Sequence, residues 1–200
     1  MSSDKVKPYI EFETGRLHIQ PVTEEDRADY MSLRVNNSEM SSAYETMPGF
    51  EDMEWNEELN SDEDIFFSVR LKNEGIFVAS ASIQNFKKST IELGYDVCKE
   101  YQNQGIATEL LKQLYIEAHR HFKDAEIIIK INKDNDASRR VAEKCGAVFI
   151  RYDDSFVSKE ISDFLSNYNN KDGIELDKSY SLLSQAVDDG KNSVCIYKFM

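Results

Sequence analysis

The order of apolar patterns between residues 90 and 152 constrains the fold of this chain more than any other feature. Residues 90–98 are rich in β-forming side chains, and residues 105–122 carry apolar side chains at helical spacing. Residues 125–131 then form an apolar run typical of a buried strand, residues 137–145 a short helix, and residues 147–152 another strand. This series of strands and helices predicts helices that cross over and pack on a sheet.

The first part of the chain predicts strands of a different kind. Residues 16–20 alternate between apolar and polar side chains and predict a strand, and Thr23 is placed to cap the helix that follows. Residues 51–59 predict a second helix. Residues 65–72 and 75–86 predict two antiparallel strands, because an Asn-Glu-Gly turn joins them.

The last 50 residues depart from this rhythm. Residues 153–192 contain two stretches with apolar side chains at helical spacing, and residues 193–200 predict a final strand. Forty residues are long for a connection between strands. We therefore expect a single α/β domain over residues 1–200, with residues 153–192 as a helical insertion before the last strand.

Composition excludes several classes of protein. A net charge of −13 argues against nucleic acid or an anionic membrane as a partner. No apolar run is long enough to span a membrane, and residues 1–7 are too polar for a secretion signal. Cys98, Cys145 and Cys195 show no CxxC spacing, so we expect no metal site, no disulfide framework and a cytoplasmic location.

The charge is unevenly distributed along the chain. Residues 37–69 contain ten acidic and no basic side chains, whereas residues 70–152 contain fourteen basic and eleven acidic ones. The second region therefore favours an anionic ligand, and the first favours a cationic one. The alternative for the acidic region is a solvated surface over packed aromatic side chains, which is the commoner meaning of a charge run.

The junction at residues 101–107, between a strand and a helix, is a candidate phosphate-binding loop. The first backbone N–H groups of such a helix are unpaired, and the positive end of its dipole attracts an anion. Gly105 and Ala107 are small enough for a phosphate to approach the backbone. Three neutral donors precede them: Gln102, Asn103 and Gln104. The spacing matches neither common glycine-rich nucleotide motif, so an ordinary turn remains an alternative.

As a set, these motifs resemble those of the GNAT superfamily of N-acetyltransferases. The acetyl-CoA motif of that family, (Gln/Arg)-x-x-Gly-x-(Gly/Ala), is matched by Gln102-x-x-Gly105-x-Ala107 after Glu92-Leu93-Gly94-Tyr95-Asp96-Val97. Its second element is matched by Asn135-Asp136-Ala137-Ser138 and Glu143-Lys144-Cys145-Gly146. Thr14-Gly15-Arg16-Leu17 is similar to the subgroup that acetylates the N-termini of ribosomal proteins. The resemblance implies a mixed, mostly antiparallel central sheet flanked by helices.

The resemblance also implies acetyl-CoA as co-substrate and assigns residues to it. The backbone of Val97 is expected to bond to the pantetheine arm, and the amides of residues 102–108 to hold the diphosphate. The set that it assigns to the cofactor is Val97, Gln102, Asn103, Gln104, Gly105, Ile106, Ala107, Thr108, Asn135, Ser138 and Arg139. Two positions depart from the family pattern: Asn103 replaces the usual glycine, and Ala147 an aromatic residue.

Simpler roles are open for the second element. Asn135 is equally suited to cap the helix that follows it, and Arg139 to a solvated surface. Cys145 has no histidine beside it in the sequence, so we expect a small buried side chain rather than a nucleophile.

The expected chemistry requires the removal of a proton. An amine arrives mostly as ammonium and must become neutral to attack a thioester. Many members of the resembled family place a tyrosine acid where this chain has Ala142. We therefore expect Glu92 as the general base and Tyr95 as the acid. Two alternatives stand beside this: Glu92 lies on a solvated strand face, or water carries the proton without a dedicated base.

These expectations define two functions. The first is an acetyl-CoA-dependent N-acetyltransferase whose primary amine acceptor, a protein N-terminus or a cationic small molecule, attacks the thioester directly. The second is a non-catalytic module of the same fold that senses acyl-CoA or binds a partner through its acidic face. The acidity of residues 37–69 favours a cationic acceptor.

Overall fold

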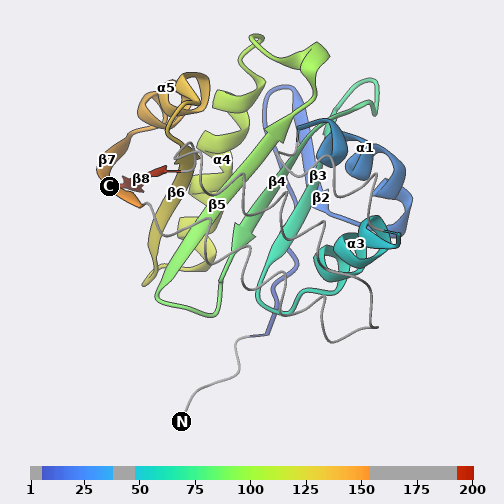
Figure 1. The fold of residues 1–200 in the computed structure, drawn as a ribbon, viewed down its shortest axis with the longest axis horizontal. Coiled ribbons are helices and arrows are strands. Elements are labelled where there is room, and N and C mark those ends of the chain that lie inside the picture. Colours follow the sequence, from blue (N-terminus) through green and yellow to red (C-terminus); the bar gives the residue numbers. More distant parts are fainter. Residues whose placement is uncertain (1–5, 38–47, 154–192) are drawn as a thin grey trace.

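The computed structural model describes residues 6–37, 48–153 and 193–200 of the chain (Figure 1). Its strands are β1 (Phe12–Glu13), β2 (Leu17–Pro21), β3 (Ile65–Leu71), β4 (Phe77–Gln84), β5 (Thr90–Val97), β6 (Glu126–Asn132), β7 (Ala147–Asp153) and β8 (Val194–Phe199). Its helices are α1 (Arg27–Asn37), α3 (Phe50–Asn60), α4 (Ile106–His121) and α5 (Asp136–Lys144), with short 3-10 turns at Glu24–Asp26 and Lys99–Tyr101.

All eight described strands form one sheet in the order β1-β2-β3-β4-β5-β6-β8-β7. Within the described residues only β5 and β6 pair in parallel, and every other pair is antiparallel. The expected mixed, mostly antiparallel sheet with flanking helices is confirmed. The last strand, β8, lies between β6 and β7, so the helix α5 connects two strands that are not neighbours.

The parallel pair separates after three residues. Residues 90–92 of β5 pair with residues 126–128 of β6. Beyond them, β5 continues to Val97 and β6 to Asn132, and within the described residues these two strands do not pair with each other again. On its other edge β5 stays paired with β4 as far as Val97. A gap therefore opens between two central strands, and the edge of β5 that faces it has no strand partner among the described residues.

The two faces of the sheet are covered by different helices (Figure 1). On one face, Ile91 and Leu93 of β5 belong to the main apolar core together with Leu110, Leu111 and Leu114 of α4. The helices α1 and α3 pack around a smaller cluster on the other face: Tyr30, Met31, Leu33, Trp55 and Phe77. A ligand in the gap can therefore meet different chemistry on the two sides of the sheet.

Most element boundaries agree with the sequence to within two residues. The expected helix after Thr23 instead opens with a 3-10 turn, in which the Asp26 carboxylate accepts from the Thr23 N–H at 3.0 Å, and α1 begins at Arg27. Gly146 has φ +90° and ends α5, as expected of a C-terminal cap. The expected helical insertion lies outside the described residues apart from Asp153, the last residue of β7.

Candidate active site

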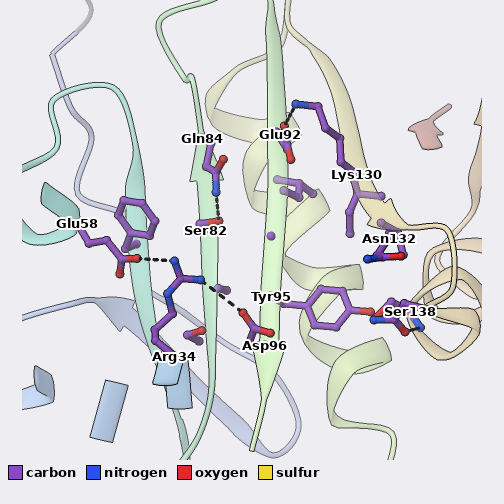
Figure 2. Close-up of a pocket in the computed structure, with 18 of the residues that line it drawn as sticks. Arg34, Glu58, Ser82, Gln84, Glu92, Tyr95, Asp96, Lys130, Asn132 and Ser138 are labelled. Carbon is purple, nitrogen blue, oxygen red and sulfur yellow. Dashed lines mark hydrogen bonds and ion pairs between the residues drawn. The ribbon is translucent and has the colours of Figure 1, made fainter. Parts of the chain in front are cut away.

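A cavity of about 250 Å³ lies where β4, β5 and β6 meet the α1 and α3 side of the sheet (Figure 2). Its floor is a set of cross-strand pairs between β4 and β5: Ser80–Asp96, Ser82–Gly94 and Gln84–Glu92. A Cβ on Gly94 would stand 2.6 Å from the Ser82 hydroxyl oxygen, closer than atoms can pack. Glycine at this position therefore leaves room for a polar floor.

Glu92 lies in the wall of this cavity. Its side chain is only 14% exposed, and Lys130 Nζ on β6 lies 2.7 Å from its Oε2 atom (Figure 2). Burial raises the pKa of Glu92, and the Lys130 ammonium opposes part of that rise. A largely buried carboxyl group of raised pKa beside a polar cavity is suited to take a proton at near-neutral pH.

Tyr95 points across the gap between β5 and β6 toward Ser138 on α5 (Figure 2). Its hydroxyl is buried and makes no hydrogen bond of normal geometry within the described residues. Burial raises the pKa of Tyr95 to about 12, against a smaller opposing effect of the Ser138 side chain. The phenol therefore stays protonated at neutral pH and can donate a proton into the gap.

A cluster of charges closes the other end of the cavity. Arg34 on α1 lies 3.3 Å from Glu58 and 3.9 Å from Glu54, both on α3, and 4.0 Å from Asp96 on β5. Burial raises the pKa values of both Glu58 and Asp96, and the Arg34 guanidinium opposes the rise. Within the described residues, one guanidinium thus faces three carboxyl groups at this end of the cavity.

The candidate phosphate-binding loop lies between β5 and α4. Gly105 is the N-cap of α4 with φ +80°, and among the described residues no side chain caps the helix, so its first amides are available to an anion. Asn103, which replaces the glycine usual in the resembled family, has φ +58°. Asparagine is one of the few other residues that adopt this left-handed conformation readily, so the replacement preserves the shape of the loop.

Arg16 fastens this loop to the start of β2. Its Nη1 atom donates to the Gln104 carbonyl at 3.0 Å, and its Nε atom donates to Glu109 on α4 at 2.7 Å. Thr14 donates to the same carboxylate at 2.5 Å. Partial burial would raise the pKa of Glu109, but these bonds lower it overall. The carboxylate is therefore neutralised at the helix N-terminus, where it would otherwise repel a phosphate.

The polar side chains of the loop bind the protein itself. Gln102 donates to the Val97 carbonyl at 3.1 Å, and Gln104 donates to the Glu100 carbonyl at 2.8 Å. Val97 is the last residue of β5 and lies at the open end of the gap. The side chains of Gln102 and Gln104 therefore shape the loop, and its exposed backbone is what faces an incoming ligand.

The residues of the second family motif, around Asn135–Arg139, lie in two different places. Asn135 and Ser138 line the cavity, and Asn135 also caps α5, because its side chain accepts from the Ser138 N–H at 3.0 Å. Arg139 does not line the cavity; it donates to the Tyr197 hydroxyl at 3.2 Å and pairs with Asp136 at 3.2 Å. Ala142 is fully buried. The structure thus brings Asn135 and Ser138 to Glu92 and Tyr95, and leaves Arg139 outside.

Sequence reasoning missed Arg16, Arg34, Asp96 and Lys130 as site residues, and it included Glu58 only as one of ten carboxylates in the acidic region. Arg16 and Asp96 lie within two sequence motifs that resemble the family, but the motifs assign no function to either side chain. The other three come from separate parts of the chain, and only the sheet register and the packing of α1 and α3 bring them to the cavity.

A family model for an acetyltransferase (GNAT) domain matches residues 16–148 of the chain. This range includes the candidate phosphate-binding loop, the gap between β5 and β6, and the residues that line the cavity. No curated protein matches the sequence significantly. In the described residues, no helix is long and apolar enough to cross a membrane.

Several solved structures share the fold at low sequence identity. An acetyltransferase (GNAT family) from Bacillus anthracis has a TM-score of 0.64 at 17% identity, covering 96% of this chain and 98% of that one. A putative ribosomal-protein-serine acetyltransferase from Vibrio cholerae has a TM-score of 0.61 at 15% identity, covering 96% and 97%. A spermidine N-acetyltransferase from Vibrio cholerae in complex with CoA and spermine has 0.57 at 17%, covering 68% and 83%.

Proposed function

The chain belongs to the GNAT acetyltransferase family, and on that premise we propose that it transfers the acetyl group of acetyl-CoA to a primary amine. The observation that carries the proposal is the gap between β5 and β6, which opens beside an uncapped helix N-terminus and into a polar cavity. An extended thioester fits such a gap, since the unpaired edge of β5 offers backbone hydrogen bonds to its amides.

The loop supports binding of the cofactor by its backbone. The first amides of α4, next to Gly105 and Ala107, are assigned to the diphosphate, and the edge of β5 near Val97 to the pantetheine arm. Asn135 and Ser138 are assigned to the part of the cofactor that enters the cavity. We do not assign Arg139 a direct contact with the cofactor, because its hydrogen bonds to Tyr197 and Asp136 hold it away from the cavity.

The cavity supports direct transfer. Glu92 takes a proton from the acceptor ammonium, and the neutral amine attacks the thioester carbonyl carbon, forming the C–N bond. The C–S bond then breaks, and Tyr95 gives its proton to the leaving thiolate. The attacking nitrogen loses its second proton as the amide forms, and that proton restores the Tyr95 phenol. Backbone N–H groups at the end of β5 near Val97 are placed to stabilise the negative oxygen that forms between these steps. Ala142 takes no part, since it is buried in the core.

The acceptor that we propose is cationic. The charges around Arg34 leave the α1 and α3 side of the cavity negative, which attracts an ammonium group. Neighbours in the fold are named as acetyltransferases of spermidine and of ribosomal proteins, and both classes of acceptor present a primary amine. A polyamine or a basic N-terminus therefore belongs in the first panel of acceptors.

Release of free thiol from acetyl-CoA tests the proposal, measured with a panel of polyamines, basic peptides and aminoglycosides. We expect turnover with at least one cationic amine and none without an acceptor beyond slow hydrolysis. Tight binding of acetyl-CoA by calorimetry, with no acetylated product from any amine by mass spectrometry, would instead support the non-catalytic binding module.

A further inference from the structure

The gap between β5 and β6 limits how far an extended cofactor can enter. It is open at Val97, beside the loop assigned to the diphosphate, and it closes at Glu92, which is paired with Ile128 of β6. The open stretch over residues 93–97 is roughly 16 Å long, at about 3.3 Å per strand residue. The end of an extended chain that enters at Val97 therefore lies near the closed end of the gap.

One position near this closed end has no side chain on the cavity face of β5. Successive residues of a strand point to opposite faces, so Glu92, Gly94 and Asp96 share the cavity face. Leu93 belongs to the main apolar core on the other face, and Tyr95 packs against that core. The thioester end of the cofactor therefore fits over Gly94, between the carboxyl groups of Glu92 and Asp96.

The space beside Gly94 is occupied by a hydroxyl group of the neighbouring strand. Ser82 of β4 pairs with Gly94, and a carbon at the Cβ position of residue 94 would lie 2.6 Å from Ser82 Oγ. The next nearest atoms to this point among the described residues are Gln84 Nε2 at 3.8 Å and Ser82 Cβ at 3.9 Å, which are ordinary contact distances. The Ser82 oxygen is therefore the atom that keeps a carbon out of this space.

The Ser82 hydroxyl is held in place. Gln84 Nε2 donates to Ser82 Oγ at 3.1 Å, and Ser82 is 6% exposed (Figure 2). Rotation of the hydroxyl would break this bond and leave buried polar atoms without partners, which is costly. An acyl group must therefore fit the space as it stands, because pushing the hydroxyl aside is unfavourable.

The other directions from Gly94 do not suit a longer acyl group. Glu92 and Asp96 flank Gly94, and both line the cavity. An apolar chain against them would displace water from carboxyl groups without replacing its hydrogen bonds. The same space must also admit the amine that gives its proton to Glu92.

We infer that Ser82 is a specificity-determining residue, whose hydroxyl forms the base of a pocket over Gly94 that accepts an acetyl group and rejects longer acyl groups. This inference rests on the proposed acetyl transfer and names what limits its acyl donor. The methyl group of an acetyl thioester needs no space below the level of Gly94. The additional carbon of a propionyl group needs the position that the Ser82 oxygen occupies, so loss of this oxygen should admit it.

The test compares acetyl-CoA with propionyl-CoA, using the same amine. Wild-type protein is expected to show kcat/KM about tenfold higher for acetyl-CoA, the usual effect of one methylene group in a fitted pocket. Ser82→Ala removes Oγ and keeps Cβ, and it is expected to reduce this preference to about twofold or less. Ser68→Ala is the matched control, since Ser68 is a buried serine of β3 outside the residues that line the cavity, and it should keep the preference.

A second substitution distinguishes a pocket from a merely structural role. In the Ser82→Ala background, Gly94→Ala places a carbon at the vacated point, 3.8 and 3.9 Å from its neighbours. The preference for acetyl-CoA should then return to within about twofold of the wild-type value. Gly94→Ala alone should lower kcat/KM for both thioesters, because its Cβ meets the Ser82 oxygen at 2.6 Å. An unchanged preference in Ser82→Ala, or no return of the preference in the double variant, overturns the inference.

Binding by calorimetry separates this inference from the proposed function. If no amine is acylated, but wild-type protein binds acetyl-CoA about tenfold tighter than propionyl-CoA and Ser82→Ala removes the difference, the pocket stands and the transferase does not. Equal turnover and equal binding of the two thioesters by wild-type protein overturn the pocket. Should Ser82→Ala fail to fold, Gln84→Met, which removes the bond that holds the hydroxyl, must lower the preference about twofold, and an unchanged preference overturns the pocket.

Discussion

The two sides of the β5–β6 gap offer different groups to a ligand: backbone on one side and charged side chains on the other. On the α4 side, the residues expected to meet the cofactor present backbone: the uncapped start of α4, a glycine at φ +80° and an asparagine at φ +58°. On the α1 and α3 side, the cavity is built from charged side chains on separate elements. Backbone geometry recognises a constant group such as a diphosphate, whereas side chains can be exchanged to suit a particular acceptor.

This comparison predicts that mutations on the two sides will affect different properties of the protein. Changes on the α4 side should affect binding of acetyl-CoA whichever acceptor is used. Changes on the α1 and α3 side should affect turnover, its pH dependence and the choice of acceptor. The following predictions run from the largest expected effect to the smallest.

Gly105→Asp should have the largest effect on cofactor binding. The new side chain requires an L residue at φ +80° and adds a negative charge where the diphosphate must approach the backbone. We expect the Kd for acetyl-CoA to rise about 100-fold or more. Gly75→Asp is the control, because Gly75 also has a positive φ of +68° but lies in the β3–β4 turn. A folded Gly105→Asp variant with wild-type affinity would contradict the assigned site.

Glu92→Gln should have the largest effect on turnover. It keeps the shape of the side chain but removes the proton acceptor, so we expect kcat to fall about 100-fold while the Kd for acetyl-CoA changes little. Glu126→Gln is a matched control, since Glu126 also lies on a strand and pairs with a lysine, Lys198, at 2.7 Å. A loss of only a few-fold would favour proton release through water.

Lys130→Met should shift the pH profile of kcat. A general base works when ionised, so activity rises with pH through the pKa of Glu92, which burial has raised above its usual value. The Lys130 ammonium favours the ionised form, so its removal should raise that pKa further. The rising part of the pH profile, called the limb below, should then move about one pH unit higher. The control is Lys198→Met, which pairs with Glu126 and should leave the limb in place. A limb that moves to lower pH or stays unchanged would show that Lys130 does not act on the base.

Arg16→Gln should have the smallest of these effects. Its contacts with the Gln104 carbonyl and Glu109 hold the loop, but the Arg16 side chain is 48% exposed. We expect the KM for acetyl-CoA to rise about fivefold with little change in kcat. The KM for acetyl-pantetheine, which has no diphosphate, should not change. Arg120→Gln at the far end of α4 is the control. An equal loss with both thioesters would indicate general damage to the fold.

Much of the fold could be predicted from the sequence because its signals are local. The Asn-Glu-Gly turn joins β3 to β4 as expected, Gly146 ends α5, and the strand-loop-helix junction around Gly105 has the expected form. Each of these depends on residues within a few positions of one another, through backbone dihedral angles and hydrogen bonds of the adjacent turn. The placement of β8 between β6 and β7 is not local, and the pattern of strands and helices did not determine it.

The sequence by itself therefore determined the order of most elements and the position of the strand-loop-helix junction, and it singled out Glu92 and Tyr95 as candidates. Tertiary structure alone decided the environment of that pair. Lys130 reaches Glu92 through the register of a parallel pair only three residues long, and Arg34 and Glu58 meet because α1 and α3 pack on the same face of the sheet. Charge pairs between distant segments depend on register and helix packing, which a local pattern does not encode. These pairs influence the pKa of Glu92, the proposed base, and the charge of the side where we propose that the acceptor binds.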